Sequence, residues 1–86
     1  MPTRISYCDR TYVPGPHVTR ATIENTGNGF GVFPIRQVSS TVDGKMIFAK
    51  PMPDSVRHGS TLPCSMAVYV RVGTNDYVAY GLGGGP

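Results

Sequence analysis

The sequence has few of the residues from which helices are usually built. Glutamate and glutamine occur once each, and leucine and lysine occur twice each. These straight side chains lose little rotamer freedom in a helix, so their scarcity disfavours a helical fold. No window of about eleven residues free of glycine and proline repeats its apolar residues every 3.6 positions. A helical domain is therefore not expected.

Long apolar runs are missing as well. Residues 1–4 are not followed by the run of about 7–15 apolar residues that a signal peptide needs. No stretch approaches the roughly 18 apolar residues of a membrane span. None of the asparagines begins a glycosylation triplet. We therefore expect synthesis in the cytoplasm and no membrane partner, and the sequence leaves later assembly into a larger particle open.

Charge is also scarce. Eight lysines and arginines face five aspartates and glutamates, for a net charge of +3, which does not suit a disordered basic tail. Ile, Leu, Val and Phe supply 19 of the 86 residues, just above the fraction of about 20% below which disorder is expected. A chain of this size buries only about 60–65% of its surface. We expect one folded domain with a thin core.

Valine, glycine and proline are abundant, with ten, eleven and eight residues. Branched side chains suit a pleated sheet, and glycine and proline divide the chain into short segments. Alternating patterns predict strands over 3–8, 17–25 and 64–72, with 11–13 extending the first strand until 14–16, Pro-Gly-Pro, ends it. In the apolar run 30–35, Pro34 favours an edge or a bend.

Two hairpins are predicted from their turn residues. Asp43-Gly44, between 37–42 and 45–49, is typical of a two-residue turn that needs positive φ. Residues 73–76 predict a turn between 64–72 and the partner strand 77–81. Asp54 is placed to cap one short helical turn.

The fold class expected from these segments is all-β. We predict a single domain over residues 1–82, a small barrel or sandwich of six to seven short, mostly antiparallel strands. Residues 83–86, Gly-Gly-Gly-Pro, predict a flexible tail.

Cys8 and Cys64 are the two cysteines of the chain. We favour reduced, buried thiols, as is usual in the cytosol, with a disulfide as the alternative. Zinc knuckles place paired ligands about two to five residues apart. The spacings from Cys8 to His17 and from His58 to Cys64 are larger, so no metal and no other cofactor is predicted.

Catalytic motifs are not found. Asp54, His58 and Cys64 are close in sequence, but a triad is defined by its geometry. The sequence contains no Gly-x-Ser-x-Gly elbow. Paired carboxylates are not expected, because Asp43 and Asp76 are assigned to turns. We therefore expect that the protein is not an enzyme.

Gly27, Gly29 and Gly31 form a Gly-x-Gly-x-Gly run. A phosphate-binding loop of this type opens a helix, whose terminal amides hold the phosphate. Here the run leads into the strand-like residues 30–33. We interpret it as a tight or bulged hairpin turn.

Arginine and tyrosine carry the strongest functional signal. Six arginines and five tyrosines occur in a chain whose isoelectric point is about 9.1. Tyr69 and Arg71 share one face of their predicted strand, and Tyr77 and Tyr80 lie on the partner strand. Tyrosine and arginine are enriched at the centres of protein interfaces. We therefore predict that Tyr69, Arg71, Tyr77 and Tyr80 bind a partner.

The leading hypothesis is a non-enzymatic interaction or structural protein that binds a partner protein or self-assembles into a homo-oligomer. A thin core and unpaired strand edges favour such association. By analogy, a short chain of this kind suits a phage- or plasmid-type accessory, either a virion component or an inhibitor of a host complex. The alternative is a single-stranded nucleic-acid-binding protein with a basic, aromatic β surface, although no basic cluster appears.

Overall fold

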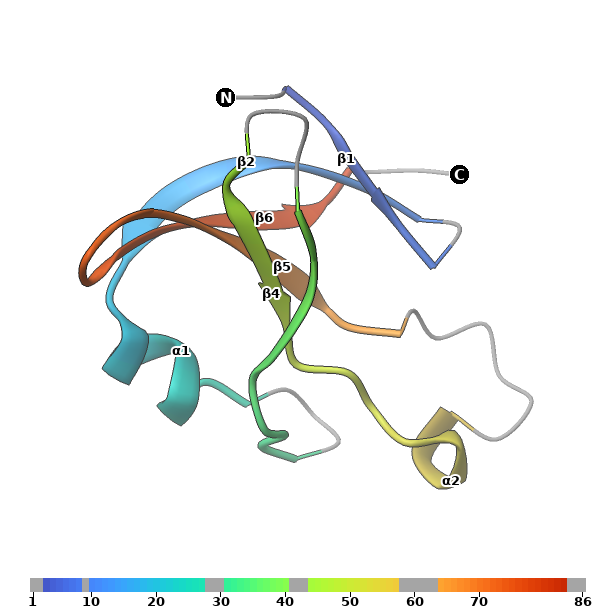
Figure 1. Ribbon diagram of the computed structural model, residues 1–86. Coiled ribbons are helices and arrows are strands. Elements are labelled where there is room, and N and C mark those ends of the chain that lie inside the picture. Colours follow the sequence, from blue (N-terminus) through green and yellow to red (C-terminus); the bar gives the residue numbers. More distant parts are fainter. Residues whose placement is uncertain (1–2, 9, 28–30, 41–43, 58–63, 84–86) are drawn as a thin grey trace.

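The computed structural model describes residues 3–8, 10–27, 31–40, 44–57 and 64–83. One antiparallel sheet contains six strands in the order β1-β2-β6-β5-β4-β3 (Figure 1). The strands are β1 (Ile5–Tyr7), β2 (Arg10–Val18), β3 (Arg36–Ser40), β4 (Met46–Ala49), β5 (Ala67–Gly73) and β6 (Asp76–Leu82), and the helices are α1 (Arg20–Asn25) and α2 (Asp54–Arg57). The all-β prediction is confirmed, but the sheet has edges at β1 and β3 and is not closed into a barrel.

The two faces of the sheet carry separate apolar clusters. Every strand contributes to the first, whose buried members are Ile5, Tyr12, Ile47, Ala49, Val68, Val70, Val78 and Tyr80, with Val38 of β3 packed against them. The second contains Ile23 of α1 packed on Tyr69 and Tyr77. Alternation along β5 thus sends valines to one face and Tyr69 to the other, as its sequence pattern predicts. Helix α1 covers the second face.

The first strand of the prediction is divided in two. Tyr7 pairs with Arg10, so the chain reverses at Cys8, which has a φ of 49°. Positive φ is what a tight hairpin turn requires, but the turn lacks the Asn-Gly or Asp-Gly signal that would have revealed it. The Pro-Gly-Pro segment does not end the strand. Strand β2 continues through Pro14 to Val18, and a register shift between Pro14 and His17 accommodates it.

The predicted strand over 17–25 is wrong beyond Val18, because residues 20–25 form helix α1. Thr19 has extended backbone angles, and its side chain accepts a hydrogen bond from the backbone N–H of Thr22. That is the contact of an N-cap residue. Ile23 is buried, whereas Ala21 is exposed. The two residues do not share a face as a strand would require.

Both predicted hairpins are present as strand pairs. In the β5–β6 hairpin, Gly73 lies opposite Asp76. In the β3–β4 hairpin, Ser40 lies opposite Met46, whereas a two-residue turn at Asp43-Gly44 would place it opposite Ile47. Gly44 has the expected positive φ of 77°, but Asp43 lies outside the described residues. The short helical turn predicted at Asp54 is confirmed as α2.

Cys8 and Cys64 form a disulfide bond, with their Cα atoms 6.0 Å apart. We expected reduced thiols, so the alternative is the one observed. The bond joins the β1–β2 turn to the segment that enters β5. At the other end of the chain, the backbone N–H of Gly83 donates to the carbonyl of Thr11 at 2.9 Å, and the remainder of the predicted tail lies outside the described residues.

Candidate functional site

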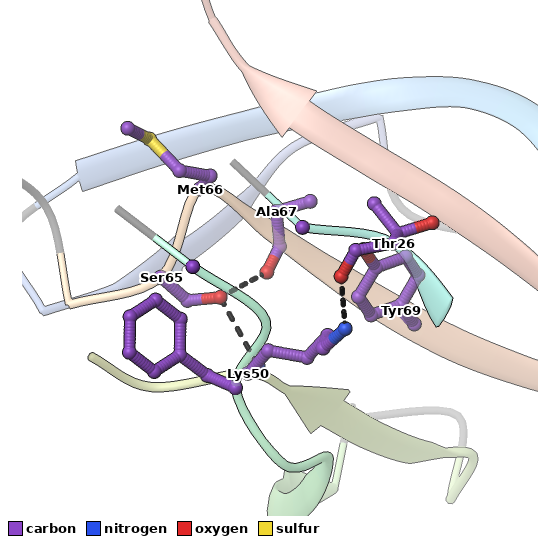
Figure 2. A pocket seen from close by; sticks show the side chains of 9 residues that line it. Thr26, Lys50, Ser65, Met66, Ala67 and Tyr69 are labelled. Atoms are coloured by element: carbon purple, nitrogen blue, oxygen red, sulfur yellow. Dashed lines mark hydrogen bonds between the residues drawn. The ribbon is translucent and has the colours of Figure 1, made fainter. Parts of the chain in front are cut away.

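Lys50 lies directly after β4 and is buried, with 8% of its surface exposed. Its ammonium donates to the carbonyl of Ile23 at 2.6 Å. It also donates to the carbonyl of Thr26 (Figure 2). The last carbonyls of a helix lack partners within the helix, and the negative end of the helix dipole attracts a cation. Lys50 therefore fastens the C-terminal end of α1 to the sheet.

Ser65 fixes the backbone beneath this lysine. Its hydroxyl accepts from the backbone N–H of Lys50 at 3.1 Å and donates to the carbonyl of Ala67 at 2.6 Å (Figure 2). Its own carbonyl accepts from the hydroxyl of Tyr12 at 2.5 Å. Ser65 is 1% exposed, and its buried polar atoms are thus satisfied by hydrogen bonds. Because Ser65 follows Cys64, the disulfide also restrains this part of the chain.

A small cavity of about 40 Å³ lies beside Lys50 and Ser65. Thr26, Gly27 and Gly31, which also line it, are exposed and form its rim. A water molecule needs roughly 10–15 Å³ of such space. The cavity therefore admits a group of two or three heavy atoms, and the buried Lys50 is one of its lining residues.

A larger groove adjoins this cavity. It has a volume of about 300 Å³ and is lined by Glu24, Val32, Phe33, Pro34 and Ile35. Phe33 lines both spaces, and Val32 is 62% exposed. Pro34 has no backbone N–H to donate to a neighbouring strand, and residues 32–35 are outside any strand. This segment therefore lines the groove from outside the sheet.

Two glycines of the Gly-x-Gly-x-Gly run shape the rim. A Cβ atom on Gly27 would lie 2.9 Å from the carbonyl oxygen of Gly31 and 2.8 Å from a methyl group of Val32. Gly31 has a φ of 131°, a conformation that favours glycine. The run permits close approach of two backbone segments, while Gly29 lies outside the described residues.

The charges near the groove are partly balanced. Arg20 donates to the carboxylate of Glu24 at 2.9 Å, and its guanidinium lies 5.7 Å from the centre of the Phe48 ring. Burial lowers the pKa of the Lys50 ammonium, and the negative charge of Glu24 opposes that shift. The site thus contains one ion-paired carboxylate and one buried cation.

The chain matches no protein-family model, no curated protein and no solved structure.

The geometry of the site itself must therefore indicate its function. Within the part of the chain that the structure describes, no group of three or more His, Cys, Asp or Glu side chains could hold a metal ion. The same part contains no helix long and apolar enough to cross a membrane. Cys64 is oxidised in the disulfide, so the sequence-adjacent set of Asp54, His58 and Cys64 offers no free thiol as a nucleophile, and His58 lies outside the described residues.

The predicted partner-binding residues do not form one exposed surface. Tyr69, Tyr77 and Tyr80 are 6%, 3% and 0% exposed. Tyr69 and Tyr77 belong to the cluster beneath α1, whereas Tyr80 belongs to the cluster on the opposite face. Arg71 is half-buried and donates to the carbonyls of Gly73 and Thr74. The expected exposed aromatic surface is not present at these positions, and their part in partner binding stays a prediction.

Sequence reasoning missed Lys50, Ser65 and Val32. The sequence did contain a signal for Lys50. This lysine interrupts the apolar segment from Met46 to Met52, and a lysine within an apolar segment is a candidate for burial. Ser65 and Val32 had none, because their positions depend on how distant segments meet.

Proposed function

We propose that the protein is a non-enzymatic interaction module that binds a partner polypeptide in the groove beside α1. The observation that carries this proposal is the open apolar groove of about 300 Å³ with Val32 exposed on its wall. Concave apolar surfaces of roughly this volume are where proteins accept ligand side chains, and exposed apolar patches commonly mark interaction sites.

The groove is a better candidate than either sheet edge. Strand β1 has three residues, and β3 contains a register shift between Gln37 and Ser39. Short edges and bulges are features with which sheets resist pairing with other chains. We therefore place the partner at the groove, where side chains rather than backbone groups make the contact. A second copy of this chain could supply the partner segment, which would make the protein a homo-oligomer.

The nucleic-acid alternative has less support. Single-stranded nucleic acid is held by aromatic rings on which bases stack. Among the described residues, no tyrosine or phenylalanine side chain is exposed; each is buried or half-buried. The proposed role as an accessory, in a larger particle or as an inhibitor of a host complex, requires only a protein-binding surface.

Selection of displayed random peptides on the immobilised protein tests the proposal. We expect enriched peptides that share an apolar residue, and we expect Val32→Asp to weaken their affinity about tenfold or more by placing a charge in the apolar contact. Met46→Asp is the matched control, because it introduces the same charge at a residue that is 41% exposed and lies on β4, outside the groove.

Two results would contradict the groove as the binding site: no enrichment of any peptide, or equal loss of affinity in the two variants. Sedimentation velocity at micromolar concentration adds the oligomeric state. A dimer that Val32→Asp dissociates would identify a second copy as the partner, and a monomer would leave a different polypeptide in that role.

A further inference from the structure

Lys50 is a buried cation without a direct anionic partner among the described residues. Its ammonium carries three N–H groups, of which two donate to the carbonyls of Ile23 and Thr26. The described ion pairs are His17 with Asp76 and Arg20 with Glu24, so no described carboxylate lies within 4.0 Å of this ammonium. Buried charges in proteins are usually paired with an opposite charge. The ammonium therefore has carbonyl groups as its direct partners, and the negative charge of Glu24 acts on it only from beyond 4.0 Å.

The cavity beside Lys50 has the size and polarity to receive the missing anion. Its volume of about 40 Å³ exceeds the space that a single water molecule needs and suits a carboxylate. Ser65 lies buried at the inner end, and the exposed rim of Thr26, Gly27 and Gly31 gives access from outside. The net charge of +3 also favours the approach of an anion.

Neighbouring titratable groups do not prevent this. Glu24 lines the adjoining groove, and its negative charge would repel a carboxylate. Its carboxylate is already paired with the guanidinium of Arg20 at 2.9 Å. Tyr69 lines the cavity as well, and burial raises the pKa of its hydroxyl, so this group remains neutral at physiological pH.

The position of Phe33 connects the cavity to the groove. Because Phe33 lines both, a ligand that fills them together must carry a carboxylate and an apolar group close to each other. The last residue of a polypeptide carries both on one Cα atom when its side chain is apolar. An internal aspartate or glutamate would need a second residue to fill the groove.

We infer that the Lys50 cavity binds the C-terminal carboxylate of a partner polypeptide, while the apolar side chain of that last residue occupies the groove. This inference rests on the proposed function, because it specifies which part of a partner the groove accepts. Lys50 would then have two roles. It anchors α1 through two carbonyls and donates its third N–H to the ligand, in the charge-assisted form of hydrogen bond that is stronger than a neutral one.

Titration of the isotopically labelled wild-type protein with two small probes tests the inference by NMR. N-acetyl-leucine carries a free carboxylate, and N-acetyl-leucinamide has the same side chain without the charge. We expect the acid to shift the amide signals of Lys50, Ser65 and Gly27, and to bind about tenfold to a hundredfold more tightly than the amide, as loss of a hydrogen bond to a charged group implies. The comparison uses the unaltered protein, so it does not depend on a variant that folds poorly.

Equal affinity of the two probes, with shifts confined to Val32 and Phe33, would overturn the role of Lys50 and leave the groove as the binding site. Absence of binding by both probes would overturn the carboxylate site, and the peptide selection would still decide the proposed function separately. As a second comparison, Lys50→Met should abolish the preference for the acid, provided that its spectrum shows a folded protein. A preference that persists in this variant would also overturn the inference.

Discussion

Removal of the Cys8–Cys64 disulfide should destabilise the protein strongly. The two cysteines are separated by 56 positions, so the bond restricts a large part of the unfolded chain. In the chain-entropy description, a loop of this length contributes about 4 kcal/mol to the free energy of unfolding. A domain of this size has a total stability of only about 4–13 kcal/mol. The double substitution Cys8→Ser and Cys64→Ser therefore removes a large fraction of it.

The loss should lower the midpoint of thermal unfolding by about 20 °C, since one kcal/mol corresponds to roughly 4–8 °C for a domain of this size. Circular dichroism during heating and urea titration measure the two quantities. Wild type in the presence of a dithiol reductant provides the control and should unfold like the double variant. A loss below about 1 kcal/mol would refute the reasoning, as would two free thiols titrated in the air-oxidised wild type.

Position 8 allows the bond and the turn to be separated. Cys8 has a positive φ, a conformation that costs most residues about 1–2 kcal/mol but that asparagine tolerates better. Cys8→Asn combined with Cys64→Ser should therefore recover about 1 kcal/mol relative to the double serine variant. Equal stability of the two variants would show that the turn does not hold this conformation without the disulfide.

Three other substitutions test the packing of the sheet. Gly15→Ala should cost about 1–3 kcal/mol, because the new Cβ would lie 2.8 Å from the carbonyl oxygen of Ala79, whereas Gly81→Ala meets nothing within 4 Å and serves as the control in urea titrations. Tyr69→Ala should cost about 3–5 kcal/mol, since the ring is buried, and a cost below 1 kcal/mol would place this ring outside the core. Burial raises the pKa of Tyr69 above its ordinary value of 10.0; the stability that its neutral form provides is complete below that pH and is lost as the pH rises through the higher value in the folded protein. Phenylalanine has no hydroxyl to ionise, so the free energy of unfolding of Tyr69→Phe relative to that of wild type should increase between pH 8 and pH values above 10. Urea titrations at the two pH values measure this difference, and an unchanged difference would contradict the assignment.

The sequence predicted the elements whose determinants are local. The alternation of Val68, Tyr69 and Val70 correctly predicts the face of the sheet that each side chain occupies, because these residues lie on a central strand between two apolar clusters. The β5–β6 hairpin follows from the turn residues that join the two strands. Both features depend on residues within a few positions of one another, so a pattern in the sequence is sufficient to reveal them.

Helix α1 could not be predicted in that way. Ala21 and Ile23 alternate with polar residues as a strand would, and one contact of the helix comes from far along the chain, the hydrogen bond from Lys50, 27 positions away, to the carbonyl of Ile23. The disulfide and the cavity have the same cause. They depend on strand order, which brings the β1–β2 turn beside the entry to β5 and which no local pattern specifies.

The pairing of β2 with β6 also sets the order in which the chain can fold during synthesis. Tyr12 lies opposite Leu82, so β2 obtains its central partner only after the residues of β6 have left the ribosome. Until then β1 and β2 can form no more than a two-stranded ribbon, which is marginally stable in water. The β5–β6 hairpin involves only local contacts and should form quickly. A nascent chain arrested before Asp76 would therefore expose the apolar side of β2 and become a substrate for chaperones and proteases.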